Sequence, residues 1–130
     1  MQNKEDPMVG YVTLGTNDLK RAATFYDELA KLLGVSRMME TERFIAWGKP
    51  GAGAGIGLTL PFDGGRATVG NGVMVALECA SPGDVDRLYA KAMELGAKDE
   101  GKPGPRGGGF YAGYFRDPDG NKLNAFHMSH

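Results

Sequence analysis

Few side chains in this sequence combine the types and spacing that chemistry needs. Its two histidines, His127 and His130, stand at the end of the chain, and Cys79 is its single cysteine. A lone cysteine cannot close an internal disulfide, and inside an apolar run it is typical of a small buried residue. Terminal histidines are typical of an exposed or partly buried tail. We therefore expect the chemistry of this protein to lie elsewhere.

Three segments rich in glycine, proline or aspartate have the composition of loops. Residues 51–57 fit G-x-G-x-x-G in no register and open a strand, which predicts a hairpin and not a phosphate loop. Residues 102–109 predict the most flexible loop, either a plain connection or a lid. The run Asp117-Pro118-Asp119-Gly120-Asn121 predicts a tight turn, because proline presets φ and the acids bond nearby amides.

Two amphipathic helices should position the rest of the chain. The first runs over 19–33, with Asn17 or Asp18 as N-cap and Gly34 at its end. The second follows Ser81 as N-cap and Pro82 as its first residue, and ends before Gly96. Each shows one apolar face of residues at helical spacing, formed by Leu19, Ala22, Tyr26, Leu29 and Leu33 in the first and by Val85, Leu88, Ala92 and Leu95 in the second.

Short apolar runs predict strands at 9–15, 35–39, 43–48, 56–60, 73–79, 97–100, 110–116 and 122–128. The order is β-α-β-β-β, and it occurs twice. This duplication predicts an α+β fold in which two modules, at about 8–61 and 72–128 with a linker at 62–71, place curved mixed sheets around a central cavity. We expect residues 1–130 to form a single domain of this kind.

Composition and charge limit the classes of binding partner that we expect for this protein. The 130 residues carry 15 basic and 16 acidic side chains, a net charge of −1, which gives no footprint for nucleic acid or for a membrane surface. No apolar stretch reaches the ~20 residues that span a bilayer. The polar residues 2–6 do not form a secretory signal, so we expect a cytoplasmic protein.

Several sequence stretches resemble the vicinal oxygen chelate superfamily, which includes glyoxalase I, extradiol dioxygenases, fosfomycin-resistance transferases and bleomycin-resistance proteins. They are Tyr-Val-Thr-Leu-Gly-Thr-Asn-Asp-Leu at 11–19, Phe25-Tyr26, Met-Val-Ala-Leu-Glu at 74–78 and Phe-Arg-Asp-Pro-Asp-Gly-Asn at 115–121. The resemblance extends from about residue 8 to residue 128. It implies the glyoxalase-like fold, but one such scaffold supports many functions.

The resemblance also implies where metal ligands would stand. The superfamily's metal enzymes place one ligand in the first strand and one in the last strand of each module. These positions correspond here to Tyr11, Met74, Asn124 and, within one residue, Thr59. Hydroxyl, thioether and amide groups are weak ligands for first-row divalent metals. By strand alternation His127 points to the opposite face from Asn124 and cannot replace a ligand, so we expect no bound metal and no cofactor.

The remaining side chains of these faces suit a small organic ligand, since aromatic walls stack and neutral polar groups orient. We therefore predict substrate-binding residues with no assigned catalytic residue, with Phe44 or Trp47 added according to a strand register that the sequence does not define. The predicted residues are Tyr11, Thr13, Trp47, Thr59, Met74, Tyr114, Asn124 and Phe126.

Three functions stay open. The first is a metal-free glyoxalase- or bleomycin-resistance-like protein that binds, and in one version transforms as a lyase, isomerase or transferase, a small organic molecule. The second is a protein that only sequesters a drug or metabolite, and the third is a metal-dependent glyoxalase-like lyase. The resemblance also implies a homodimer, because modules of this kind leave unpaired sheet edges.

Overall fold

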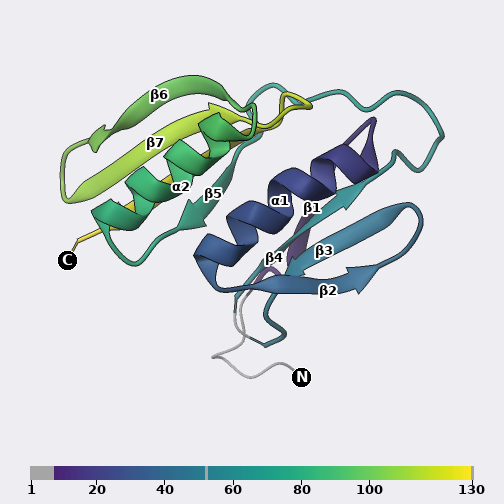
Figure 1. Cartoon of the computed structure of the whole chain (residues 1–130), viewed down its shortest axis with the longest axis horizontal. Coiled ribbons are helices and arrows are strands. Elements are labelled where there is room, and N and C mark those ends of the chain that lie inside the picture. Colours follow the sequence, from purple (N-terminus) through teal and green to yellow (C-terminus); the bar gives the residue numbers. More distant parts are fainter. Residues whose placement is uncertain (1–7, 52, 130) are drawn as a thin grey trace. The chain divides into compact units, whose positions relative to one another are not determined.

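The chain folds as two successive β-α-β-β-β units (Figure 1). The computed structural model describes residues 8–51 and 53–129, so residues 2–6 and His130, considered above, lie outside the described part. Unit 1 extends to Ala67 and unit 2 begins at Thr68, inside the connector predicted at 62–71. The repeated element order confirms the predicted duplication and the α+β class.

Unit 1 is a four-stranded mixed sheet with one helix across it (Figure 1). Its elements are β1 (Tyr11–Gly15), α1 (Leu19–Leu33), β2 (Ser36–Glu40), β3 (Phe44–Gly48) and β4 (Gly55–Thr59). The strand order is β1-β4-β3-β2, with β1 parallel to β4 and the other neighbours antiparallel. Asp18 caps α1 by accepting the Arg21 N–H at 3.1 Å, and Gly34 ends the helix in the left-handed conformation at φ 75°.

Unit 2 repeats this arrangement with β5 (Val75–Glu78), α2 (Pro82–Glu94), β6 (Lys98–Pro105), β7 (Phe110–Arg116) and β8 (Lys122–Met128). The strand order is β5-β8-β7-β6, with β5 parallel to β8. Ser81 is the N-cap of α2, its hydroxyl accepting the Asp84 N–H at 3.1 Å, and Pro82 begins the helix.

The predicted apolar stripes pack each helix on its own sheet. Ala22, Tyr26 and Leu29 of α1 are buried, as are Val85, Leu88 and Ala92 of α2. Leu19, Leu33 and Leu95, at the helix ends, are only partly buried. Opposite them, the sheets contribute Leu14, Ile45, Leu58, Leu77, Phe115, Leu123 and Ala125 to the core.

The expected boundaries of β6 and of its following loop were wrong. The strand predicted at 97–100 continues to Pro105, so residues 102–105 belong to β6 and only 106–109 connect it to β7. Glycine and proline are tolerated there because β6 is an edge strand, and its pairing with β7 shifts register around Gly101. Similarly, β5 begins at Val75 rather than at Val73.

None of the helices in the described residues is long and apolar enough to cross a membrane.

Candidate functional site

Each sheet has one face covered by its helix, which we call the helix face, and an opposite one, which we call the open face. In unit 2, Leu77, Leu123 and Phe115 point to the helix face, since all are buried and the Phe115 ring contacts Tyr89 of α2. Side chains alternate along a strand, so the residues between them belong to the open face.

The turn at 117–121 sets the register of the unit 2 open face. The Asp117 carboxylate accepts the backbone N–H groups of Asp119 and Asn121, both at 2.9 Å, and Gly120 takes a φ of 94°. This confirms the predicted turn. It pairs Tyr114 of β7 directly with Asn124 of β8, and Asn124 also lies opposite Ala76 of β5.

Asn124 is the most unusual polar residue of this face. It is 1% exposed, and its amide oxygen has no hydrogen-bond partner among the described residues. A buried acceptor left unpaired costs free energy, and such groups in native structures usually serve a further purpose. Its neighbours on the adjacent strands are Ala76 of β5 on one side and Tyr114 of β7 on the other.

Aromatic rings of the open face lie along the strands on either side of Asn124, and two cations lie beside one of these rings. Phe126 stacks on Phe110, with ring centroids 5.5 Å apart and planes at 25°. The Arg106 guanidinium lies 5.5 Å from the Tyr114 ring centroid and the Lys122 ammonium 5.6 Å from it. The predicted residues Tyr114, Asn124 and Phe126 are therefore brought together on one face.

On the open face of unit 1, an aromatic ring covers the position equivalent to Asn124. The Tyr11 and Phe44 rings meet edge to face at 5.9 Å, and the Phe44 ring covers Gly57 of β4. A Cβ atom built on Gly57 would lie 2.5 Å from Phe44 Cε1, so no side chain fits there unless Phe44 moves. Thr13 lies on the same face, directly opposite Gly57.

The internal repeat corrects one predicted position. Tyr11 and Met74 each lie seven residues before a helix N-cap, Asp18 and Ser81, so the two are equivalent. Asn124 pairs with Ala76, two residues after Met74, and the matching partner of Thr13 in unit 1 is Gly57. The last-strand position of unit 1 is therefore Gly57 and not Thr59. Thr59 lies further along β4, where its hydroxyl bonds the Leu60 carbonyl oxygen at 2.8 Å.

Trp47 was predicted as a ligand contact, with Phe44 as the alternative that depends on the strand register. Its indole N–H donates to the Asp27 carboxylate of α1 at 2.8 Å, and its ring contacts Tyr26. It therefore belongs to the helix face, and the register that pairs Phe44 with Thr59 puts Phe44 on the open face. Met74 precedes β5 and is exposed.

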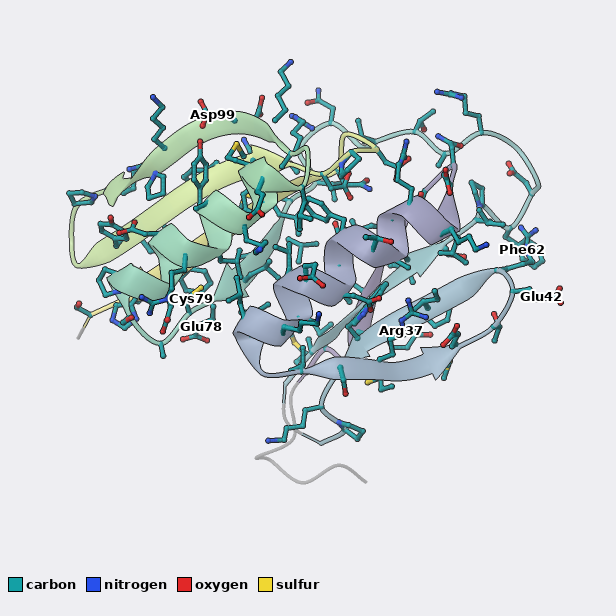
Figure 2. The ribbon with its side chains drawn as sticks, viewed as in Figure 1. Arg37, Glu42, Phe62, Glu78, Cys79 and Asp99 are labelled. Atoms are coloured by element: carbon teal, nitrogen blue, oxygen red, sulfur yellow. The ribbon has the colours of Figure 1, made fainter. Side chains whose placement is uncertain are left out.

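The strongest pKa shifts lie away from the open faces. Arg37, between α1 and the β2–β3 hairpin in Figure 2, bonds the Asp27 carboxylate at 2.8 and 3.0 Å and holds its pKa below the usual range. In unit 2, burial and a 2.7 Å bond to Asp99 of β6 raise the pKa of Tyr89 to about 12. These contacts tie a helix to its sheet, which is a structural role.

Cys79 and His127 also belong to the helix face. Burial raises the pKa of the Cys79 thiol to about 11, which keeps it protonated and unreactive. His127 Nδ1 lies 3.0 Å from the Cys79 carbonyl oxygen. Figure 2 shows Cys79 and Glu78 at the end of β5, and alternation directs Glu78 to the open face. These placements agree with a structural cysteine and with a histidine turned away from Asn124.

The donor chemistry does not fit a first-row metal. The four positions carry a phenol (Tyr11), no side chain (Gly57), a thioether (Met74) and an amide (Asn124). Across residues 8–51 and 53–129, no three His, Cys, Asp or Glu side chains gather in a group that could hold an ion. At Gly57 the Phe44 ring occupies the space a ligand side chain would need.

Sequence reasoning offered Phe44 as an alternative to Trp47 on this face but missed that its ring covers Gly57. The signal was present, because glycines alternating along a strand, Gly55 and Gly57, often mark a close approach by another group. What covers them depends on the pairing of β3 with β4. Lys122, the second cation beside Tyr114, was also missed, since it was assigned only to a strand end.

The family model and the most similar structures described here point to the same protein superfamily. The model of the Glyoxalase/Bleomycin resistance protein/Dioxygenase superfamily matches residues 8–125. A glyoxalase/bleomycin resistance protein from Albidiferax ferrireducens T118 is 34% identical, with a TM-score of 0.86 over 94% of this chain and 99% of that one. Among curated proteins none matches the sequence.

More distant structures share the fold alone. A putative glyoxalase from Bacillus halodurans is 21% identical, with a TM-score of 0.76 over 92% of this chain and 95% of that one. A lactoylglutathione lyase from Agrobacterium tumefaciens is 18% identical, with a TM-score of 0.67 over 92% of each chain. By the family model and by its 34% identical relative, this chain belongs to the Glyoxalase/Bleomycin resistance protein/Dioxygenase superfamily.

Proposed function

We propose that this protein binds a small organic molecule on the open face of unit 2, without a resident metal, and retains it rather than transforming it. The observation that carries the proposal is the buried, unpartnered amide oxygen of Asn124 between Ala76 and Tyr114. A ligand with an N–H or O–H group would satisfy this oxygen. The Phe110–Phe126 stack and the Tyr114 ring supply apolar contact for a planar ring.

Retention is favoured over turnover by the position of the titratable groups. Acid–base catalysis relies on groups whose pKa is displaced toward the working pH inside the site. Here the displaced groups, including Asp27, Cys79 and Tyr89, lie on helix faces or helix surfaces, and several are moved away from neutrality. This supports the sequestering function among the three that the sequence left open.

Unit 1 supports the same conclusion about the metal. Its ligand positions are Tyr11, with a phenol, and Gly57, covered by Phe44. An aromatic pair provides an apolar surface and no imidazole or carboxylate for Zn, Ni, Fe or Mn. The shared cavity expected between the two modules stays a prediction.

The experiment is a ligand-observed NMR screen with small aromatic amides, phenols and acids, combined with elemental analysis of freshly purified, tag-free protein. We expect binding by wild type, weaker binding by Asn124→Leu, and unchanged binding by Tyr111→Phe, a helix-face control in the same sheet. Metal should be far below one ion per chain. Stoichiometric metal whose removal abolishes binding would instead support the metal-dependent lyase.

We further propose that the protein is a homodimer. The described sheets end in edge strands, β1 and β2 in unit 1 and β5 and β6 in unit 2. Exposed apolar side chains, such as Val73 and Met74, lie just before β5. Unpaired edges with apolar neighbours favour association. Sedimentation should give twice the chain mass, and a monomer mass over a wide concentration range would contradict the dimer.

A further inference from the structure

The cations around Tyr114 have an arrangement that ordinary surface charges lack. The Arg106 guanidinium is fixed by its own chain, donating to the carbonyl oxygens of Gly104 at 2.9 Å and Lys102 at 2.7 Å. Lys122, on β8, approaches the same ring. Two cations thus lie beside one aromatic ring of the open face.

No carboxylate among the described residues neutralises this pair. The adjacent cation Arg116 shows the contrast, because its Nε lies 3.2 Å from the Glu100 carboxylate. Within the described part of the chain, neither Arg106 nor Lys122 has an acidic side chain within ion-pair distance. Glu78, the other acid of this face, lies on β5 across from Phe126. The positive charge of the pair therefore stays available.

The ring that both cations contact, Tyr114, is paired with Asn124, which carries the unpartnered acceptor. Tyr114 and Asn124 are directly opposite on adjacent strands, so their Cβ atoms are about 4.5–5.5 Å apart. A ligand that reaches both would direct an anionic group to the Tyr114 cations and a donor group to the Asn124 oxygen. The Arg106 guanidinium has further N–H groups besides those that donate to the carbonyl oxygens of Gly104 and Lys102. Their planar arrangement suits a carboxylate.

We propose that Arg106 and Lys122 form an anion-binding subsite, so that the ligand on the open face of unit 2 is a small aromatic acid carrying an N–H or O–H donor. This inference rests on the proposed function. It adds the chemical class of the ligand and assigns Arg106 and Lys122 to its recognition.

The test uses matched pairs that differ by the negative charge and one methyl group: 4-hydroxybenzoate and 4-aminobenzoate, each against its methyl ester. Dissociation constants are measured by calorimetry or NMR titration. We expect the acids to bind about tenfold more tightly than the esters, equivalent to about 1.4 kcal/mol. Added salt should weaken binding of the acids and not of the esters.

Variants assign the preference to these residues. Lys122→Met should weaken acid binding about threefold, since Arg106 keeps its share of the preference, and should leave ester binding unchanged; Lys122→Arg should retain the full preference. Lys91→Met, on the surface of α2, is the matched control and should change neither. Arg106→Met is the second variant, with folding checked by circular dichroism because its guanidinium also holds the 102–104 backbone.

The outcomes separate the two proposals. Esters that bind as tightly as acids, or an acid preference that neither Lys122→Met nor Arg106→Met reduces, would overturn the anion subsite while leaving the proposed function intact. If neither series binds the wild-type protein, the proposed function fails and the subsite fails with it.

Discussion

Units 1 and 2 share one topology but differ in what fills the equivalent position of their open faces. In unit 1 this position is Gly57, covered by the Phe44 ring, and in unit 2 it is Asn124, with a free amide oxygen. In the same comparison, the helix faces are alike: Leu14 and Leu77, at equivalent positions, are both buried. The difference shows that the helix face maintains the fold while the open face is free to change its chemistry.

On the helix faces, the two units form the same kind of strand-to-helix hydrogen bond with different residues. In unit 1 the Trp47 indole of β3 donates to Asp27 of α1 at 2.8 Å. In unit 2 the Tyr111 hydroxyl of β7, the corresponding strand, donates to Asp86 of α2 at 2.7 Å. Both bonds fasten the third strand of the unit to its helix. The recurrence of this contact supports a structural role for Trp47, which the sequence had suggested as a ligand contact.

The largest expected effects concern the two cores. Leu29 of α1 and Leu88 of α2 are each 1% exposed. Replacing either by alanine should lower the free energy of unfolding by about 2–5 kcal/mol, because a buried side chain is lost and a cavity remains. Urea titration measures the change. Leu32→Ala, at an exposed position of α1, is the control and should change stability by less than about 0.5 kcal/mol. A small effect at Leu88 would mean that α2 does not pack as described.

The next largest effect is expected at Gly57, the position of unit 1 that the Phe44 ring covers. Gly57→Ala places a methyl group against Phe44 and should cost about 1–3 kcal/mol of stability through overpacking. Phe44→Ala should relieve this clash, so the double variant should be more stable than the sum of the single effects predicts. A double-mutant cycle by urea titration measures the coupling. Purely additive effects would show that Phe44 does not cover Gly57.

Asn124 should show the opposite behaviour in unit 2. Asn124→Leu keeps the size of the side chain and removes the unpartnered acceptor, so stability should stay equal or rise by about 1 kcal/mol while ligand binding falls. Asn124→Asp, which buries a charge, should lower stability. Thermal unfolding and NMR titration measure the two quantities. If Asn124→Leu lost stability and kept binding, the amide would be structural.

Alkaline pH should lower the free energy of unfolding by a smaller amount, through the Cys79 thiol of unit 2. The Cys79 thiol has its pKa raised by burial from about 9 to about 11, so its contribution to stability is present below pH 9 and is lost as the pH rises through 11. Urea titrations at pH 8.5 and 10.5 should therefore show a loss of stability that is smaller in Cys79→Ala. An equal loss in both proteins would mean that the thiol is accessible to solvent.

Much of the fold was predictable because its signals are local. The caps at Asp18, Gly34 and Ser81 and the turn at 117–121 depend on neighbouring residues, and the structure confirms them. The face of β3 was not predictable, because it depends on pairing with β4 and on the register shift between Arg37 and Met39 of β2. The pairing of β6 across its glycines likewise needs a partner strand.

The candidate site was predictable only in part. Strand alternation placed Tyr114, Asn124 and Phe126 on one face, as the structure has them. The unpartnered oxygen of Asn124 and the ring over Gly57 result from packing between segments that are distant in sequence, for which one sequence holds no signal. Glu42 and Phe62, labelled in Figure 2, are exposed residues in loops of unit 1.

The most direct test of the account is NMR titration of isotope-labelled protein with 4-hydroxybenzoate, following the backbone amides and the Asn124 side-chain amide. We predict that the Asn124 side-chain signals and the amides of Ala76, Tyr114 and Phe126 shift together with a single dissociation constant, while those of α2 do not. Shifts confined to the helix face, or an unchanged Asn124 amide at saturation, would contradict a ligand site on the open face of unit 2.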